Sequence, residues 1–264
     1  MTQPAGDLHV HTTASDGTLT IPELPEAASQ AGIEWVAVTD HDRIHPDLDA
    51  PVTNRDGVSI IRGIELRVDT DRQRLDLLGY GVEPTDALVA ECDRLQQNRA
   101  DRARKIIDRV ETSVGTTLDI EPQTGIGRPH IARAIEESDA AYDYQAAFDE
   151  LIGDGCPCYV AREITPFDRG RELLADACSV VGLAHPLRYD DPAAALDRTA
   201  DLDAVERYYP YDRAVDLTPV EDAIDSHDLL ATGGSDAHDR TLGRAGPPES
   251  AVRAVRDRLP EAVR

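Results

Sequence analysis

Short apolar segments recur along this chain, and a polar, metal-ligating side chain follows or closes most of them. These segments are residues 7–11, 35–40, 58–65, 75–80, 180–185, 204–208 and 229–236. Helical patterns lie between several of them, such as 22–31, which ends before Gly32, and 219–227. Because parallel strands of an α/β barrel all end on one face, we expect these polar side chains to lie together. The alternation predicts an α/β barrel of about seven strand and helix units.

One interval breaks this rhythm. Residues 84–167 open with a long polar helical pattern over 86–111 and continue with two shorter ones, 131–137 and 144–152, without a clear strand. We therefore predict a barrel formed by residues 1–83 and 168–264, with 84–167 as a helical insertion over the barrel mouth. The alternative is that these are ordinary barrel helices separated by poorly patterned strands.

The charge balance is strongly acidic. The chain has 51 Asp and Glu residues against 27 Lys and Arg, a formal net charge of −24, and Lys105 is its single lysine. Such a composition is typical of proteins from salt-accumulating cytosols, where salt screens self-repulsion, so we predict a halophilic protein with salt-dependent folding. Acidity as a plain solubility feature is the alternative. A chain without a basic face is also not expected to bind long nucleic acids.

Targeting and redox signals are few. The sequence has no signal-peptide pattern and no apolar run of membrane-spanning length, which predicts a cytoplasmic protein that does not contact membranes. Four scattered cysteines favour reduced thiols over a disulfide framework. Nothing in the sequence indicates the oligomeric state.

A metal site is indicated by pairs of ligand residues with strand spacing. Residues two apart on a strand point to the same side, so His9 and His11 present two imidazoles together, as do Asp236 and His238 if the strand continues there. The full candidate set is His9, His11, Asp16, His41, Glu65, Asp76, His185, Asp236 and His238. This is more than one ion can use. Imidazole and carboxylate ligands without thiolates suit Mn²⁺, Zn²⁺ or Fe²⁺, and two or three ions can share ligands such as Glu65.

The order of these motifs resembles one known family. Asp7-Leu-His-Val-His11 with Ser15-Asp-Gly17, Val38-Thr-Asp-His-Asp42, Gly63-Ile-Glu65, Ala184-His-Pro186 and Gly234-Ser-Asp-Ala-His238 are similar to motifs of the polymerase and histidinol phosphatase (PHP) phosphoesterases. Segments 99–106, 128–133, 158–160 and 185–189 further resemble the branch that hydrolyses nucleoside 3′,5′-bisphosphates, 5′-nucleotides and short oligonucleotides, which also carries a helical insertion.

The resemblance implies a distorted TIM-like (β/α)7 barrel with two or three divalent ions, Mn²⁺ preferred. It assigns His9, His11, Glu65 and Asp236 to the first ion, Asp16, His41 and His238 to the second, and Glu65, His185 and position 76 to the third. The family commonly has histidine at that last position, whereas this chain has Asp76. Its charge favours a harder ion such as Mn²⁺ and makes the third site the most divergent.

Substrate residues are predicted from the same motifs. Arg99, Arg128, His130, Arg133 and Arg188 are candidates for binding phosphate, and His130, Asp236 and His238 are the candidate catalytic residues. Arg99, with Arg102 and Arg104, could instead form a solvated helix face, and His130 could simply start a helix after Pro129. Glu206 is expected to support the site or bind a substrate hydroxyl, with a purely structural role as the alternative. His45 and His227 lack a partner motif and are expected to be exposed.

These patterns predict a metal-dependent phosphoesterase. Its substrate would be a small phosphorylated compound, a nucleotide or short oligonucleotide, attacked by metal-activated hydroxide while arginines bind the phosphate oxygens. Histidinol phosphate hydrolysis, a non-catalytic PHP binding or scaffold domain, and another metal hydrolase chemistry such as amide hydrolysis are the alternatives.

Overall fold

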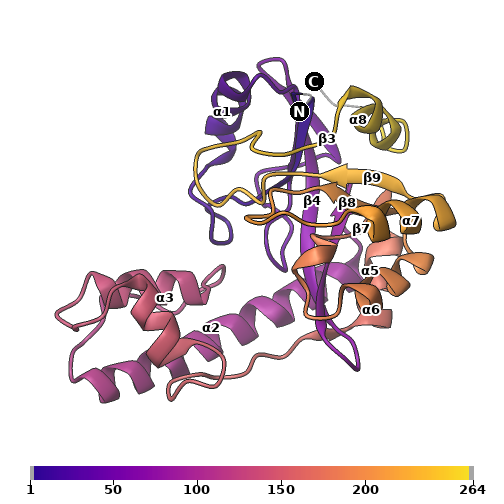
Figure 1. Cartoon of the computed structure of the whole chain (residues 1–264). Coiled ribbons are helices and arrows are strands. Elements are labelled where there is room, and N and C mark those ends of the chain that lie inside the picture. Colours follow the sequence, from indigo (N-terminus) through magenta and orange to yellow (C-terminus); the bar gives the residue numbers. More distant parts are fainter. Residues whose placement is uncertain (1–2, 262–264) are drawn as a thin grey trace. The chain divides into compact units, whose positions relative to one another are not determined.

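The computed structural model describes residues 3–261 (Figure 1). The chain divides into two compact units, one formed by residues 1–90 and 164–264 and the other by residues 91–163.

The first unit is built on a curled sheet. Its strands are β1 (Gly6–Val10), β2 (Trp35–Val38), β3 (Val52–Arg55), β4 (Val58–Asp69), β5 (Arg74–Tyr80), β6 (Thr165–Pro166), β7 (Val180–Leu183), β8 (Ala204–Tyr208) and β9 (Leu230–Gly233). Seven of them follow the order β1-β2-β4-β5-β7-β8-β9, while β3 and β6 pair with β4. A parallel bridge between Val10 and Ala237 brings the chain after β9 back to β1. The predicted distorted α/β barrel is confirmed.

Two strands run against their neighbours: β3, which is antiparallel to β4, and β5. β5 is antiparallel to both β4 and β7, whereas β1, β2 and β4 pair in parallel, as do β7, β8 and β9. Only residues 70–73 join β4 to β5, which is too short for the crossover that a parallel pair needs. The expectation that Glu65 and Asp76 lie at strand ends is therefore wrong. Glu65 lies inside the long β4, and Asp76 is near the beginning of β5, beside Arg67 of β4.

Helices flank the sheet as the apolar periodicity predicts. They are α1 (Leu24–Ala31), α5 (Phe167–Ala177), α6 (Pro192–Leu196), α7 (Thr218–His227) and α8 (Glu249–Arg256). α1 has proline in its first turn and ends at Gly32, whose φ of 68° is a left-handed conformation that glycine adopts without strain. In Figure 1, α5, α6 and α7 lie on the β7 and β8 flank of the sheet. One core cluster joins strand side chains such as Leu8, Ile61 and Tyr80 to Val255 of α8.

The second unit is helical and has its own core. It contains most of α2 (Asp86–Val114), then α3 (Arg128–Glu136), α4 (Tyr144–Ala146) and the π-helical turn η2 (Ala147–Ile152). Residues 91–163, all of which are described, contain no strand. Ile106, Val110, Ile131, Ile135 and Ile152 pack together in its interior. The insertion boundaries 84–167 and its position over the barrel mouth stay predictions.

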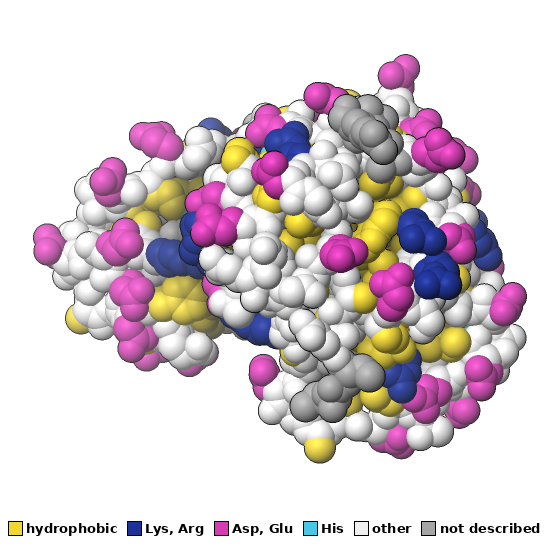
Figure 2. Space-filling view, turned by 90° about the horizontal axis from the view of Figure 1, so that it is seen from above, with side chains coloured by type: hydrophobic (Ala, Val, Ile, Leu, Met, Phe, Trp, Pro, Cys, Tyr) yellow, Lys and Arg dark blue, Asp and Glu magenta, His cyan; other side chains and the backbone are white. Residues whose placement is uncertain are grey.

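Carboxylates are spread over the molecular surface. Figure 2 shows Asp and Glu side chains distributed over the whole visible face rather than gathered in one patch. Among residues 3–261, no helix combines the length and apolar character needed to cross a membrane.

Candidate metal centre

Two histidines lie at the base of the site: His9 belongs to β1, and His11 follows directly after this strand ends at Val10. His9 and His11 are fully buried, and their ring centroids lie 5.2 Å apart. Next to them, Gly234 approaches so closely that a Cβ atom there would lie 2.3 Å from the His9 backbone nitrogen. Glycine at position 234 is therefore required for the chain after β9 to reach β1.

Glu65 lies between several imidazoles. Its Oε1 is 3.5 Å from Nε2 of His9 and 3.3 Å from Nε2 of His185, while its Oε2 is 3.4 Å from Nε2 of His11 and 2.7 Å from Nδ1 of His41. The Oδ1 atom of Asp236 completes this side, at 3.2 Å from Nε2 of His11. A single buried carboxylate thus faces four ligand residues, as expected of a bridging ligand.

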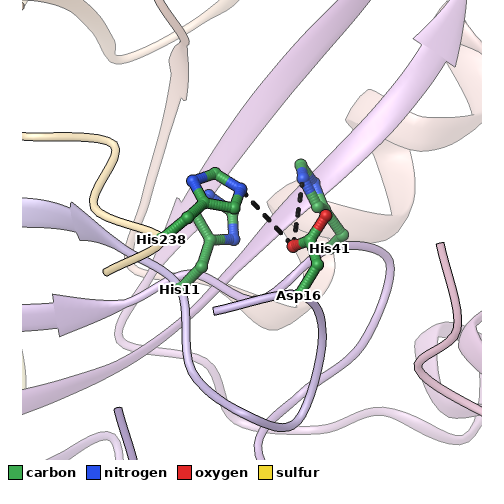
Figure 3. A group of neighbouring side chains, drawn as sticks. All are labelled: His11, Asp16, His41 and His238. Atoms are coloured by element: carbon green, nitrogen blue, oxygen red, sulfur yellow. Dashed lines mark ion pairs between the residues drawn. The ribbon is translucent and has the colours of Figure 1, made fainter. Parts of the chain in front are cut away.

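A second group lies at the edge of the site. Figure 3 shows Asp16 among His11, His41 and His238, with Oδ1 of Asp16 at 3.4 Å from Nε2 of His238 and 3.7 Å from Nε2 of His41. The loop that carries Asp16 is held by Asp40, which accepts hydrogen bonds from the backbone of Thr12 and the hydroxyl of Ser15. His11 thus adjoins both the first and the second groups.

The third group differs from the other two because both oxygens of one of its carboxylates are bonded to an arginine. Glu65, Asp76 and His185 are all buried, with Oδ2 of Asp76 at 3.7 Å from Nε2 of His185. Both Asp76 oxygens also accept hydrogen bonds from the Arg67 guanidinium, each at 2.6 Å. Sequence reasoning missed Arg67, because the partnership depends on the antiparallel register of β5.

The three groups fit divalent cations. Within each group the ligand atoms lie within 4.8 Å of one another. Nε2 of His9, Nε2 of His11 and Oδ1 of Asp16 are buried and have no hydrogen-bond partner. Buried polar atoms without partners are costly unless another ligand satisfies them. Imidazole nitrogens and carboxylate oxygens converging in this way are the donor set that Mn²⁺, Zn²⁺ or Fe²⁺ takes.

The electrostatics of the groups also favour cations. Burial acts to raise the pKa of Glu65, but the imidazoles of His41 and His9 outweigh it and hold that pKa well below its usual range. Burial lowers the pKa of His11, and the neighbouring His41 lowers it further, which favours the neutral, ligating imidazole. Burial also disfavours charge on His238, yet its contacts with Asp16 raise its pKa to about 9. The carboxylates therefore attract positive charge strongly.

Glu206 supports the ligands from behind. It is fully buried, its Oε1 lies 3.2 Å from Nδ1 of His9, and its Oε2 accepts a 2.7 Å hydrogen bond from the backbone nitrogen of His185. A carboxylate on the far nitrogen of a ligating histidine fixes its tautomer and orientation. This geometry favours the supporting role expected for Glu206.

Backbone strain accompanies these contacts. His185 and Asp236 have φ values of 29° and 49°, which non-glycine residues adopt at a cost of ~1–3 kcal/mol each. Asp42, at the end of the β2 motif, shares this conformation with a φ of 51°. Strained residues at three strand ends mark this region as a functional site.

His45 and His227, which lie outside the ligand groups, differ in their exposure to solvent. His227 is exposed, as expected, but the expectation for His45 is wrong. His45 is only 5% exposed, and its Nδ1 accepts a hydrogen bond from the backbone nitrogen of Asp47. It serves a local turn, which its isolated position in the sequence did not indicate.

Arg188 lies beside the metal ligands. Its guanidinium donates to Oδ2 of Asp236 at 2.9 Å and to the Tyr209 hydroxyl at 2.8 Å. Tyr209 itself donates to the same Asp236 oxygen at 2.9 Å. One oxygen of Asp236 thus faces His9 and His11, while the other is held by Arg188 and Tyr209. Tyr209 was not found from the sequence, because no spacing links it to the ligand motifs.

The remaining predicted substrate residues belong to the second unit. Arg128 pairs with Asp154 at 2.7 Å, and His130 starts α3 with its Nδ1 accepting from the backbone of Gly127 at 3.0 Å. Arg133 is exposed in the last turn of α3, and Arg99 is half-buried on α2. Arg102, for which a solvated helix face was the alternative, is partly buried. Its burial and the nearby Arg128, Arg162 and Arg99 lower its pKa to about 10. These arginines form a positively charged cluster in a chain of opposite net charge.

Fold and site together define an α/β barrel with three adjoining groups of candidate metal ligands. Comparison with known proteins supports this class. The PHP domain model matches residues 7–153. The 3′,5′-nucleoside bisphosphate phosphatase of Chromobacterium violaceum is 27% identical over 246 residues, covering 88% of this chain and 86% of that protein. The phosphoribosyl 1,2-cyclic phosphate 1,2-diphosphodiesterase of Eggerthella lenta is 31% identical over 248 residues, covering 88% and 93%.

The fold has a solved counterpart as well. A crystal structure from Bifidobacterium adolescentis, of a protein assigned to the metal-dependent phosphoesterases, superposes with a TM-score of 0.83 at 24% identity and covers 98% of this chain and 99% of that one. The chain therefore belongs to the PHP domain family.

Proposed function

We propose that this protein is a metal-dependent phosphoesterase that hydrolyses phosphate esters of nucleotides. The observation that carries the proposal is the convergence of three ligand groups around the buried Glu65. Relatives named for phosphatase and phosphodiesterase activity on phosphorylated ribose compounds support the same reaction class. The persistence of all three groups argues against a scaffold domain without activity.

The chemistry follows from the charges. Cations bound by these groups would neutralise phosphate oxygens and lower the pKa of a bound water, the attacking group in such reactions. Asp236 would accept a hydrogen bond from the water close to His9 and His11, while Arg188 offers planar N–H donors to phosphate oxygens at the same edge. His238, partly exposed beside Asp16, is placed to exchange a proton with the substrate or with solvent.

Metal preference enters as part of the proposal. We assign Mn²⁺, because carboxylates contribute to each group and Asp76 stands where the family commonly has histidine. The Arg67 pair with Asp76 makes the third group the weakest of the three, so two cations are held firmly and a third weakly.

The second unit supplies further phosphate contacts in this proposal. Arg99, Arg128 and Arg133 would bind substrate phosphate, and His130 would donate a proton to the leaving group. The positively charged surroundings of Arg102 support an anion site there. We further propose a cytoplasmic protein adapted to high salt, on the basis of its acidic surface.

Inorganic phosphate release tests the proposal. The panel contains adenosine 3′,5′-bisphosphate, adenosine 5′-monophosphate and histidinol phosphate, assayed in concentrated KCl with Mn²⁺ and with a chelator as control. Chelator-sensitive release from the nucleotides is expected, and preference for histidinol phosphate would move the assignment to that activity. Absence of release from every compound, with metal bound, would refute the phosphoesterase assignment.

A further inference from the structure

A cavity opens next to the metal ligands. It has a volume of about 420 Å³ and is lined by residues that follow β7 and β8, namely Leu187, Arg188, Tyr209, Pro210, Tyr211, Asp212 and Arg213. This volume is within the range of small-molecule sites, which combine apolar and aromatic walls with a few polar groups. The lining has that composition: two aromatic rings, a leucine and a proline, with two arginines and one aspartate.

The cavity is connected to the metal centre by hydrogen bonds. Arg188 and Tyr209, both in the lining, hold Oδ2 of Asp236, whose Oδ1 lies 3.2 Å from Nε2 of His11. The Tyr209 ring also meets the His185 ring edge to face, with centroids 5.5 Å apart. A phosphate bound at the metal centre would thus have the cavity directly beside it, where the rest of the ester must lie.

Two aromatic rings of the cavity wall lie next to each other, with their planes tilted by 57°. Tyr209 and Tyr211 have centroids 4.9 Å apart, and the Arg188 guanidinium lies 5.7 Å from the Tyr209 centroid. Tyr211 is fixed from behind, because its hydroxyl accepts a 3.1 Å hydrogen bond from the backbone nitrogen of Leu187. A rigid, half-exposed ring with arginines nearby suits a flat base that is joined to a phosphate.

We infer that this cavity is a nucleobase subsite, in which the base of the substrate stacks on Tyr211 while Arg188 contacts phosphate. The inference rests on the proposed function, which already specifies nucleotides, and adds the residues that would bind the base and so distinguish a nucleotide from a phosphorylated sugar without a base. Arg213, whose guanidinium bonds to the carbonyl of Leu187 at the cavity wall, adds positive charge for a second phosphate. Asp212 supplies an acceptor for ribose hydroxyls or base amino groups.

The test compares two 5-phosphates of ribose, one with adenine at C1 and one with a hydroxyl group there. Adenosine 5′-monophosphate and ribose 5-phosphate are assayed with the whole chain, its Tyr211→Leu variant and its Tyr211→Phe variant. The wild type is expected to prefer the nucleotide by about tenfold or more in kcat/KM, because one base–aromatic stack contributes at least a factor of this order. Compared with Tyr211→Phe, which loses the same hydroxyl, Tyr211→Leu should lose the preference through a higher KM for the nucleotide, with a much smaller change in kcat/KM for ribose 5-phosphate. Tyr211→Phe keeps the ring and should keep the preference.

Each outcome separates the two proposals. Equal loss on both substrates in Tyr211→Leu, or no preference in the wild type, would overturn the subsite while leaving the phosphoesterase intact. Absence of release from both compounds would count against the proposed function, and the subsite would then be decided by calorimetric titration of the same compounds with Mn²⁺. Tighter binding of the nucleotide that Tyr211→Leu abolishes would support the subsite, and equal binding would overturn it.

Discussion

Arg67 offers the sharpest test of how the third ligand group works. Its guanidinium makes two 2.6 Å hydrogen bonds to Asp76, whose side chain is 2% exposed, whereas the Arg67 side chain is 38% exposed. Arg67→Met keeps much of the apolar stem and removes the charge. The buried Asp76 carboxylate would then lose its closest cationic partner, because the nearby imidazole of His185 is 3.7 Å away.

The expected cost follows from this geometry. Breaking a fully buried ion pair costs ~3–5 kcal/mol, and an exposed pair contributes ~0–1 kcal/mol. Because Arg67 is partly exposed, we expect Arg67→Met to lower the free energy of unfolding by ~2 kcal/mol in the presence of a chelator. A cation bound at the third group would satisfy Asp76 in its place. In saturating Mn²⁺, the loss of unfolding free energy caused by Arg67→Met should therefore be about half or less of the loss measured with chelator. A purely structural ion pair would give the same loss in both conditions.

Although Arg67→Met should lower the stability, it should raise the affinity of the third group for Mn²⁺. A guanidinium repels a divalent cation a few ångströms away by ~1–2 kcal/mol even at the dielectric constant of water. Removing it should tighten the weakest Mn²⁺ site about tenfold. Urea unfolding in concentrated KCl measures the stability, and equilibrium dialysis with metal analysis measures the sites.

Arg253→Met is the matched control. Arg253 lies on α8, its side chain is 60% exposed, and its contact with Glu249 is 3.8 Å long, so its loss should leave both stability and metal binding almost unchanged. An equal loss of stability in Arg67→Met with and without Mn²⁺, together with unaltered metal affinity, would refute the competition between Arg67 and a cation.

Three further results are expected. Asp236→Asn should abolish phosphate release and lower bound metal while circular dichroism stays unchanged, and full activity in this variant would refute the site. Glu206→Gln should weaken metal binding by about 10- to 100-fold, because it removes the carboxylate on Nδ1 of His9, and unchanged affinity in dialysis would contradict that role. Transfer from concentrated KCl to dilute buffer should unfold the chain, since a net charge of −24 is then poorly screened; unaltered circular dichroism at low salt would show that the acidity serves solubility alone.

The sequence was sufficient for the barrel and for the positions of the seven strands on the main path of its sheet, but it did not predict β3 and β6. Apolar runs such as 180–185 and 204–208 correspond to β7 and β8, because a buried strand needs an unbroken apolar stretch and leaves that record in the sequence. The ligand residues were also visible, since the alternation of a strand fixes His9 and His11 on one side. In the structure, all nine candidate metal ligands lie in the three ligand groups.

Strand direction was less accessible. The pattern of residues 75–80 is the same in a parallel and in an antiparallel strand, so periodicity could not show that β5 reverses. The short connection 70–73 was the available signal, because four residues suffice for a hairpin and not for a crossover. Tyr209 and Arg67 have no such signal. Their partners, Asp236 and Asp76, are recognised only once the register is known.

The reversal of β5 links these observations into one argument about the third group. In a uniformly parallel barrel, position 76 would be at the opposite end of its strand from the metal ligands. Antiparallel pairing instead sets Asp76 beside Arg67 and within 3.7 Å of His185. The same register therefore places both the candidate ligand Asp76 and the Arg67 guanidinium, which competes with a cation for it, at this group. An aspartate at this position gains two charge-assisted hydrogen bonds when the cation is absent, which a histidine could not accept. We therefore expect the residue pair to be stable without a third ion, and the occupancy of that site to vary with metal concentration over a range in which the first two groups stay filled.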